Sequence, residues 1–494
     1  MEQLPALLII VPMLIAPLCV LVRQPTWSWG FALFASLSCT VVSLKLMIQV
    51  SAEGAIRYAL GGWAAPTGIE YYVDAANAPI LVLVSLLSAV ALVYAYHSVR
   101  KSIDTSRHYL FYTAWILCVT GLLGMSITGD IFNVFVFLEI SSLSTYSLIA
   151  FGQDRRALTA SFRYLILGSV GASFILIGIA FLYAATGTLN MVDLAERIPQ
   201  AESTRAILVA FSFLTIGLMI KTAVFPLHAW LANAYHYAPV AVTVFLAGTA
   251  TKVSLYVLLR VFLSIFTPEY SFGVMVLNAV LLPTAVLAFV LMSLVAVFQT
   301  DMRRMLAYSS VAQIGYIVAG IAIGTQAGVT AGYAHIINHA IIKSTLFMSV
   351  GCVLYRVGHT HAPSVDRLFT MMPLSVIAFL LAGLGLIGVP LTAGFVSKFT
   401  LIGAAMDQGW WMVSGLVLVS SLMATLYIGR VVQLMLFRKG RKVAAEPVVF
   451  NEAPKLMLIA MYTLLAIGLW LGINGSFVLN LSADAARVLI GGYP

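Results

Sequence analysis

Long apolar runs recur along the whole chain, and they restrict its fold more than any other feature of the sequence. A helix needs about 20 apolar residues to cross a bilayer, whereas the strands of a membrane barrel alternate apolar and polar residues. The runs here are continuous, so they predict an all-α integral membrane protein with about fourteen transmembrane helices. The predicted spans lie near residues 4–22, 29–50, 78–98, 109–128, 131–151, 162–185, 206–226, 240–264, 273–298, 305–323, 329–355, 372–405, 410–437 and 454–476.

The composition agrees with a protein surrounded by lipid. Of the 494 residues, 61% are hydrophobic and only 9% are charged, whereas soluble domains carry roughly 25% charged residues. The net charge of +9 fits the basic cytoplasmic loops of membrane proteins, so we expect a lipid bilayer and no nucleic acid as partner. The four cysteines stand singly, and glycine-rich nucleotide motifs do not occur. We therefore expect no disulfide framework, metal site or bound cofactor.

The basic residues between the spans predict an orientation. Cytoplasmic loops are enriched in lysine and arginine, and one set of alternate loops holds sixteen such residues against four in the other. Fourteen spans then place both termini on the outside. The larger set comprises Arg23, Arg100, Lys101, Arg107, Arg155, Arg156, Arg163, Arg303, Arg304, Arg356, Arg367, Arg438, Lys439, Arg441, Lys442 and Lys455. The smaller set comprises Arg57, Arg197, Arg205 and Arg487.

Charged residues inside the spans point to function. An ionised side chain at the bilayer centre costs roughly 2.5–3.5 kcal/mol on insertion scales, so such residues face a bundle interior or a wet cavity. Glu139 is the one acidic residue that we predict deep in a span. Long basic side chains near span ends can reach an interface, which we expect of Lys45, Arg260 and Arg430. The remaining basic residues are candidates for function: Lys221, Lys252, Lys343 and Lys398.

Two predicted spans contain helix-breaking residues near a buried lysine. Pro226 follows Lys221, and Gly388 with Pro390 precedes Lys398. Such breaks persist at membrane depth only where protein or a wet cavity satisfies the freed backbone groups. Paired broken helices are typical of inverted-repeat transporters, and an inverted repeat predicts that the lysine precedes one break and follows the other.

Glu139 and Lys221 are natural charge partners. Burial disfavours the charged form of both groups, so each could load and release a proton. The alternatives are a protonated glutamate that only joins two helices and a plain ion pair. Because a buried pair adds little stability, we favour a pair that opens and closes to gate a proton.

His335, His339 and Lys343 recur at intervals of four residues and therefore share one helix face. Histidine titrates near neutral pH, so we interpret this face as a proton relay with Lys252 and Lys398. Satisfied core histidines are the main alternative, and a metal site is disfavoured because no carboxylate lies nearby.

His228 follows the Pro226 break, where it could receive protons from the cytoplasmic side or cap the broken helix. Asp301, Arg303 and Arg304 open a span, and we expect them at the membrane interface.

Four stretches resemble one family, the D subunits of Mrp-type cation/proton antiporters. They are residues 129–139, which end in Glu139, residues 221–228, residues 300–310, and Asn338–Ala340 with Lys343. The resemblance covers roughly residues 70–440, and the antiporter-like subunits of respiratory complex I and of membrane-bound hydrogenases share these motifs. The chain length and the runs at 164–169 and 186–190 are most similar to the D type.

The resemblance implies two inverted five-helix repeats with helices 7 and 12 broken. Residues 1–108 would hold helices 1–3, residues 109–264 the first repeat (helices 4–8) and residues 273–437 the second (helices 9–13). Residues 438–494 would form a cytoplasmic loop and helix 14. The implied location is a prokaryotic cell (inner) membrane.

The resemblance also implies roles by position. Glu139 is similar to the fifth-helix glutamate, Lys221 to its seventh-helix partner and Lys252 to the eighth-helix relay lysine. His335 and His339 resemble the eleventh-helix relay. Lys398 resembles the twelfth-helix lysine that passes protons to the far side.

One departure concerns the proton intake. The family usually has Pro-Asp after the Trp-Leu pair of the broken helix, but here Ala232 and Asn233 follow Trp230 and Leu231. An acidic residue near the cytoplasmic intake is therefore missing.

The expected function is that of a proton-translocating subunit in a multi-subunit monovalent cation (Na+)/proton antiporter. Its partners would be other membrane subunits, protons and Na+, and the chain would be a transporter subunit rather than an enzyme. The alternative is a proton-pumping subunit of a redox-driven complex. A lone transporter for a small solute is disfavoured because the resemblance is to subunits of assemblies.

Overall fold

A computed structural model describes residues 3–362, 368–437 and 451–493. Arg367 and most of the predicted cytoplasmic loop, with Arg438, Lys439, Arg441 and Lys442, lie outside the described residues. In the described part of the chain, thirteen helical segments are long and apolar enough to cross a membrane. The shorter helix α16, which is continued by α17, supplies a fourteenth span, so the predicted all-α membrane fold is confirmed.

The spans keep the predicted order with small shifts of their ends. They are α1 (Leu4–Val22), α2 (Pro25–Glu53), α3 (Ala78–Ser102), α4 (His108–Ile127), α5 (Ile131–Ala150), α6 (Arg156–Thr186), α8 (Thr204–Lys221), α10 (Val240–Gly248) with α11 (Ala250–Leu259), α12 (Asn278–Val297), α13 (Met302–Ala322), α14 (Gln326–Val357), α16 (Pro373–Ile387) with α17 (Ala393–Asp407), α18 (Trp411–Phe437) and α19 (Lys455–Ile473). Smaller elements connect them: the antiparallel strands β1 (Ile56–Ala59) and β2 (Glu70–Val73), helices α7 (Met191–Arg197), α9 (Leu231–Tyr237) and α15 (Leu368–Met371), and the π-helices η4 (Arg260–Ile265) and η5 (Glu269–Val274).

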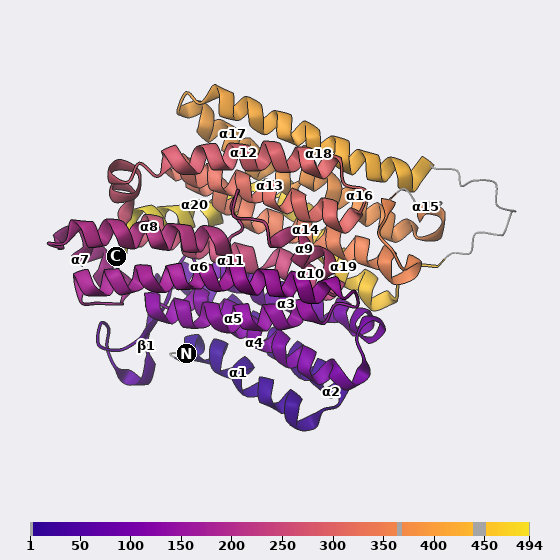
Figure 1. The fold of residues 1–494 in the computed structure, drawn as a ribbon, viewed down its shortest axis with the longest axis horizontal. Helices are drawn as coiled ribbons and strands as arrows, with labels where there is room; N and C mark the ends of the chain where they lie inside the picture. The colour runs from indigo at the N-terminus through magenta and orange to yellow at the C-terminus, as the bar shows by residue number, and fades with distance from the viewer. Residues whose placement is uncertain (1–2, 363–367, 438–450, 494) are drawn as a thin grey trace, which may run out of the picture.

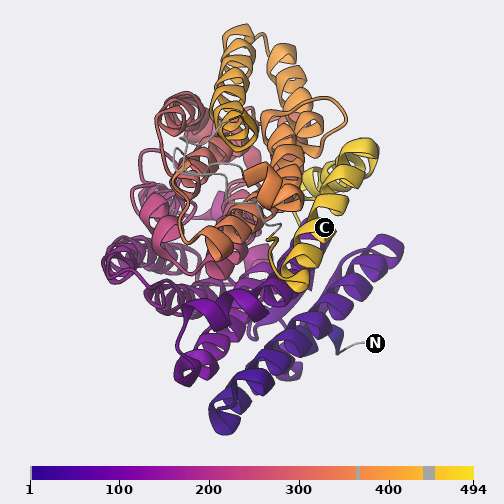
Figure 2. The same cartoon turned by 90° about the vertical axis from the view of Figure 1, so that its right-hand side faces the viewer.

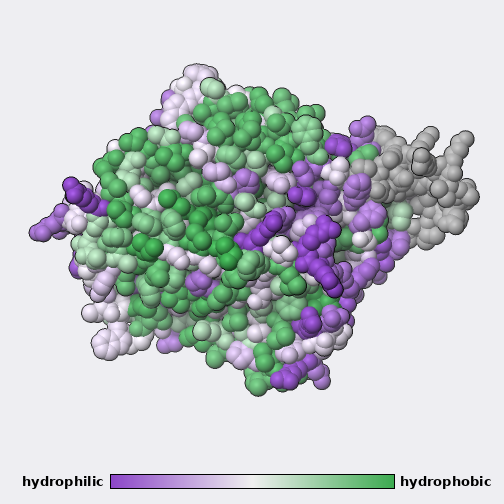
Figure 3. Space-filling model, in the orientation of Figure 1, coloured by the Kyte–Doolittle hydropathy of each residue, from purple (hydrophilic) through white to green (hydrophobic). Residues whose placement is uncertain are grey.

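The spans run roughly side by side along the long axis of the molecule (Figure 1). Helices α1 and α2 lie at one edge of the bundle and α18 at the opposite edge, as the turned view also shows (Figure 2). Hydrophobic residues cover most of the face seen in Figure 3, while hydrophilic residues gather toward the end at which α15 lies. This distribution fits a protein whose middle faces lipid and whose ends face water.

Helix α14 forms the centre of the bundle. It packs against α10, α13, α16, α17, α19 and α20 (Gly475–Gly491), and every residue from Gly328 to Val353 is buried. A helix that is buried on all sides has no lipid-facing stripe. Its polar residues therefore contact other helices, and among them are His335, His339 and Lys343.

Three spans are interrupted in the middle. The two predicted breaks are present: α8 ends at Lys221 and is followed by α9, and α16 ends before Gly388, whose φ of 91° is left-handed. A third break, which we did not predict, separates α10 from α11 at Thr249. No proline marks that position, so the residue pattern does not indicate it.

Two helix starts support an inverted relationship between the halves. The Asp130 carboxylate accepts from the amide of Asn133 at the start of α5, and Asp301 does the same with Arg304 at the start of α13. Each aspartate also forms a β-bridge to the segment that follows the next long helix, with Asn190 after α6 and with His361 after α14.

These two starts lie at opposite ends of α3. Gly129 bonds to Glu70 in β2, just before α3 begins, whereas Asp301 lines a cavity with Ser98 and Lys101, where α3 ends. A helix of 25 residues is roughly 37 Å long. The same local arrangement thus occurs twice with opposite direction, while the repeat boundaries at 109–264 and 273–437 remain a prediction.

Two features differ from expectation. Helix α20 was not predicted, because Asn480, Asp484 and Arg487 interrupt its apolar residues, and it packs its buried face against α14. Arg260 was expected to reach an interface, which is wrong. Its side chain is 4% exposed and pairs with the equally buried Asp74 ahead of α3.

Candidate functional site

Glu139 and Lys221 face each other between α5 and α8. The Lys221 ammonium lies 3.6 Å from Glu139 Oε1 and donates to the Ser142 hydroxyl at 3.0 Å. Lys221 is buried, whereas 28% of the Glu139 side chain is exposed. Lys221 is the last residue of α8, where the chain breaks before Pro226, so the helix end directs its side chain toward α5.

Lys252 lies just after the unpredicted break. Its ammonium donates to the carbonyl of Ala247 at 2.5 Å and to the Thr251 hydroxyl at 3.2 Å. Because α10 ends at Gly248, the Ala247 carbonyl lacks its usual partner within the helix. The lysine therefore bonds to a carbonyl oxygen that the break leaves without a helical partner.

His335 is held on both sides of its ring. Nδ1 lies 2.8 Å from the Ser397 hydroxyl, and Nε2 lies 3.0 Å from Oε1 of Gln313. In the neutral imidazole, Nε2 donates to Gln313 and Nδ1 is left to accept a proton. His335 can therefore take up a proton on the side of α17.

His339 lies one turn farther along α14. Its ring is parallel to that of His335, with centroids 5.7 Å apart. Both ring nitrogens are buried and have no hydrogen-bond partner among the described residues. A buried imidazole without a partner is costly, and the contacts that would satisfy His339 as a core histidine do not come from the described residues.

Lys343 and Lys398 complete the group. Lys343 donates to the Leu306 carbonyl at 2.9 Å and to the Ser309 hydroxyl, both on α13. Lys398 on α17 donates back to Leu386 at 2.9 Å and Ile387 at 3.0 Å. These carbonyls end α16, where the helix dipole favours a positive charge.

Five basic groups thus gather around α14, and we call Lys252, His335, His339, Lys343 and Lys398 the basic cluster. Electrostatic interactions link them to one another. Their hydrogen-bond partners among the described residues are hydroxyl groups, carbonyl oxygens and one amide, without a carboxylate. Because a nearby like charge disfavours the charged form of a group, protonation of one member makes protonation of its neighbours less favourable.

The predicted residues therefore fall into two groups. Hydrogen bonds among the described residues do not connect the Glu139–Lys221 pair with the basic cluster. His228 joins neither group: it lies half-buried between α8 and α9 and stacks on Phe225, with ring centroids 5.3 Å apart.

Gln313, Ser397 and Tyr316 contribute contacts that the residue patterns did not indicate. Gln313 and Ser397 hold His335, and the Tyr316 ring centre lies 4.8 Å from the Lys398 ammonium. All three are uncharged residues in apolar runs, so the pattern of buried charges does not mark them. The isolated polar residue Gln313, in the middle of its span, was the available signal.

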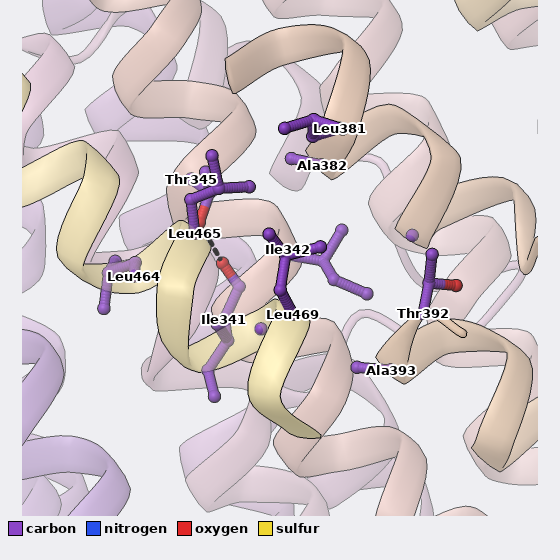
Figure 4. A pocket seen from close by; sticks show the side chains of 12 residues that line it. Ile341, Ile342, Thr345, Leu381, Ala382, Thr392, Ala393, Leu464, Leu465 and Leu469 are labelled. Atoms are coloured by element: carbon purple, nitrogen blue, oxygen red, sulfur yellow. Dashed lines mark hydrogen bonds between the residues drawn. The ribbon is translucent and has the colours of Figure 1, made fainter. Parts of the chain in front are cut away.

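A small cavity lies on another face of α14, with a mostly apolar lining that also includes Thr345 and Thr392. Its volume is about 20 Å³, and it lies between α14, α16, α19 and the start of α17, where its apolar lining includes Ile341, Ile342 and Leu469 (Figure 4). Such a cavity has room for about one water. His335, His339 and Lys343 do not line this cavity.

The fold and the buried basic cluster define an antiporter-like membrane subunit, and comparison with known proteins agrees. Residues 128–424 match the family model described as NADH:quinone oxidoreductase/Mrp antiporter, transmembrane. The chain belongs to this family. The predicted resemblance is thereby confirmed.

Two relatives represent the two branches. The N subunit of an NADH-quinone oxidoreductase from Desulforudis audaxviator is 40% identical over 87% of this chain and 86% of its own. The D-type subunit of a Na(+)/H(+) antiporter from Alkalihalophilus pseudofirmus is 30% identical over 92% of this chain and 91% of its own.

Two solved structures share the fold. A chain of the Mrp complex from Dietzia has a TM-score of 0.90 and 25% identity, and the match covers 99% of this chain and 97% of that one. A chain of the archaeal membrane-bound sulfane sulfur reductase has a TM-score of 0.90 and 31% identity, with 99% and 98% covered. This protein is therefore an antiporter-like subunit of the Mrp or complex I-like class.

Proposed function

We propose that this chain moves protons through the membrane as a subunit of a multi-subunit monovalent cation/proton antiporter, with Na+ as the expected cation. The observation that carries the proposal is the basic cluster around α14. Five proton-binding groups share one buried space without a carboxylate among their described partners. Such groups exchange protons more readily than they hold a metal cation, which requires oxygen ligands.

The Glu139–Lys221 pair supports the same function. Its carboxylate is partly exposed and its ammonium is buried, so the pair lies where charge from outside the chain can act on the interior. When the pair opens, the Lys221 ammonium loses its contact with the carboxylate. When the pair closes, the carboxylate balances the charge of Lys221. We propose that this motion controls proton loading of the basic cluster.

A redox-driven complex is the second candidate. The observation that favours it is the identity of 40% to the N subunit of an NADH-quinone oxidoreductase. In that case the proton path would be the same, and other subunits would hold the redox centres.

The composition of the purified complex separates the two candidates. Mild solubilisation with a tagged chain, followed by mass spectrometry and absorbance spectra, would identify the partner subunits. The antiporter proposal expects small membrane subunits without flavin or iron–sulfur absorbance, and partners with these centres would overturn it. Vesicles that hold the complex should also show a pH change when Na+ is added, and none when choline replaces Na+.

A further inference from the structure

A polar cavity of about 460 Å³ opens at the end of the molecule where α3 ends. We call it the vestibule. It lies between the ends of α3, α9 and α14 and the start of α13, and the proton relay proposed for the basic cluster does not use it. Its lining includes five residues with charged or histidine side chains beside Arg303: Lys101, Asp154, His236, Asp301 and His359.

Among these charged residues and histidines, Arg303 is the buried one. We expected it at the membrane interface, but only 8% of the residue is exposed. Its Nη2 donates to the carbonyls of Tyr235 at 2.9 Å and Ala238 at 2.5 Å and to the Thr243 hydroxyl at 3.1 Å. The guanidinium thus extends into the protein from the wall of the vestibule, which Arg303 lines.

The three oxygen atoms around Nη2 include two carbonyls at the C-terminal end of α9. Carbonyl and hydroxyl oxygens gathered around one point are also the groups that replace the water shell of an alkali cation in selective channels. Nη2 occupies the position that such a cation would take. The Arg303 guanidinium is therefore a cation, covalently part of the chain, that binds oxygen atoms of the kind that coordinate alkali cations.

One of the residues that bind Arg303 also extends toward the relay. Tyr235 supplies one of the carbonyls, and its hydroxyl donates to the Leu246 carbonyl at 3.2 Å and interacts with Thr251. Thr251 in turn accepts from the Lys252 ammonium at 3.2 Å. One residue, Tyr235, thus spans the distance from the floor of the vestibule to the basic cluster.

We propose that Arg303 is the residue that keeps alkali cations out of the proton relay, because it occupies the oxygen ligands that would admit them from the vestibule. A proton ends its transfer bound to an amine or an imidazole and needs no such ligands. A Na+ ion needs them, and its charge is also repelled by the guanidinium. The coupled cation of the complex accordingly takes a route other than this one. The inference rests on the proposed proton-conducting function.

The test measures Na+ leakage apart from proton transport. The intact complex is placed in liposomes, and uptake of radioactive Na+ is followed down a Na+ gradient without a pH difference. All variants carry Glu139→Gln, which removes antiport and leaves only leakage. Adding Arg303→Ala should raise Na+ uptake about tenfold or more, since tenfold corresponds to only about 1.4 kcal/mol of barrier.

Two further variants separate charge from packing. Arg303→Lys should keep Na+ out, because an ammonium can occupy the same oxygen atoms. Arg304→Ala is the matched control, since the neighbouring arginine makes none of these contacts. This variant should also exclude Na+. Should Arg303→Ala prevent assembly, Arg303→Met replaces it as a neutral variant without a hydrogen-bond donor, and it should leak.

Two results would overturn the inference. One is a neutral Arg303 variant that assembles and takes up Na+ no faster than its parent. The other is a lysine variant that takes up Na+ as fast as the neutral variant. Failure of the proposed function itself gives a different result. In that case the complex with Glu139→Gln alone still moves protons, whatever happens at Arg303.

Discussion

Lys221 lies closer to the Ser142 hydroxyl, at 3.0 Å, than to the Glu139 carboxylate, at 3.6 Å. Ser142 follows Glu139 by three residues, so both side chains lie on one face of α5. Glu139 Oε1 is buried and accepts no hydrogen bond from the described residues. The pair is therefore not closed to hydrogen-bond distance, and we infer that the Ser142 hydroxyl competes with the carboxylate for Lys221.

Ser142→Ala should let Lys221 close onto Glu139 and slow proton movement. A hydrogen bond to a charged group contributes about 1.5–3 kcal/mol, so we expect roughly a tenfold lower rate. Proton uptake by vesicles that hold the complex measures the effect. Ser147→Ala is the matched control, because this exposed hydroxyl donates to the Leu143 carbonyl of its own helix. A wild-type rate in Ser142→Ala would contradict the competition.

Gly394→Ala should uncouple Lys398 from the end of α16. An added Cβ would overlap the carbonyl oxygen of Gly385, so α16 and α17 would have to move apart. We expect loss of proton movement by the assembled complex. Gly403→Ala on the same helix meets no atom within 4 Å and should behave as wild type. Equal activity of the two variants would show that the junction tolerates displacement.

Arg260→Ala should destabilise the protein without altering the relay. It leaves Asp74 buried without its partner, a change that typically costs about 3–5 kcal/mol. Thermal unfolding of the purified complex followed by tryptophan fluorescence measures the loss. Arg430→Ala removes an exposed arginine that bonds to Val297, and it should shift the melting temperature little. A comparable shift for both variants would mean that the Asp74 pair contributes no special stability.

Asp301 should stabilise the start of α13 in a pH-dependent way. Burial raises the pKa of Asp301, but hydrogen bonds from His236, Thr360 and the Arg304 amide outweigh it, and the net pKa lies below the usual 3.8. A lowered folded pKa means that the stabilisation is complete above about pH 5 and is lost as the pH falls through the folded value. Asp301→Asn should thus cost about 1 kcal/mol at pH 7.

Unfolding of wild type and Asp301→Asn at several pH values checks this sign. The difference in stability should be present above about pH 5 and shrink as the pH falls below the usual aspartate pKa of 3.8. A difference that grows as the pH falls below 3.8 would reverse the assignment.

The sequence predicted the parts of the fold and site that depend on hydropathy and charge. Continuous apolar runs marked the spans, and Lys221, Lys343 and Lys398 stood out because ionised groups are rare there. Helix α20 escaped because its polar residues break the apolar pattern. Arg260 was misplaced because its partner, Asp74, lies 186 residues away in sequence.

The contacts of the site depend on packing, which single-residue patterns do not contain. Gln313 and Ser397 meet His335 from two other helices, and neither carries a charge that marks it. Arg303 is similar, because a residue at the start of a span can point outward or inward. Only the position of Tyr235 and Ala238 on a neighbouring segment decides that it points inward.

Control of proton movement by Glu139 and Lys221, through the basic cluster, is the central claim. Its most direct test is proton uptake by vesicles that contain the assembled complex with Glu139→Gln or Lys221→Ala, beside Lys45→Ala as the matched control. Lys45 lies in a span but is exposed on the surface. We predict that both relay variants assemble and lose ion-coupled proton uptake, while Lys45→Ala keeps it. Normal uptake in a fully assembled Glu139 or Lys221 variant would contradict the claim.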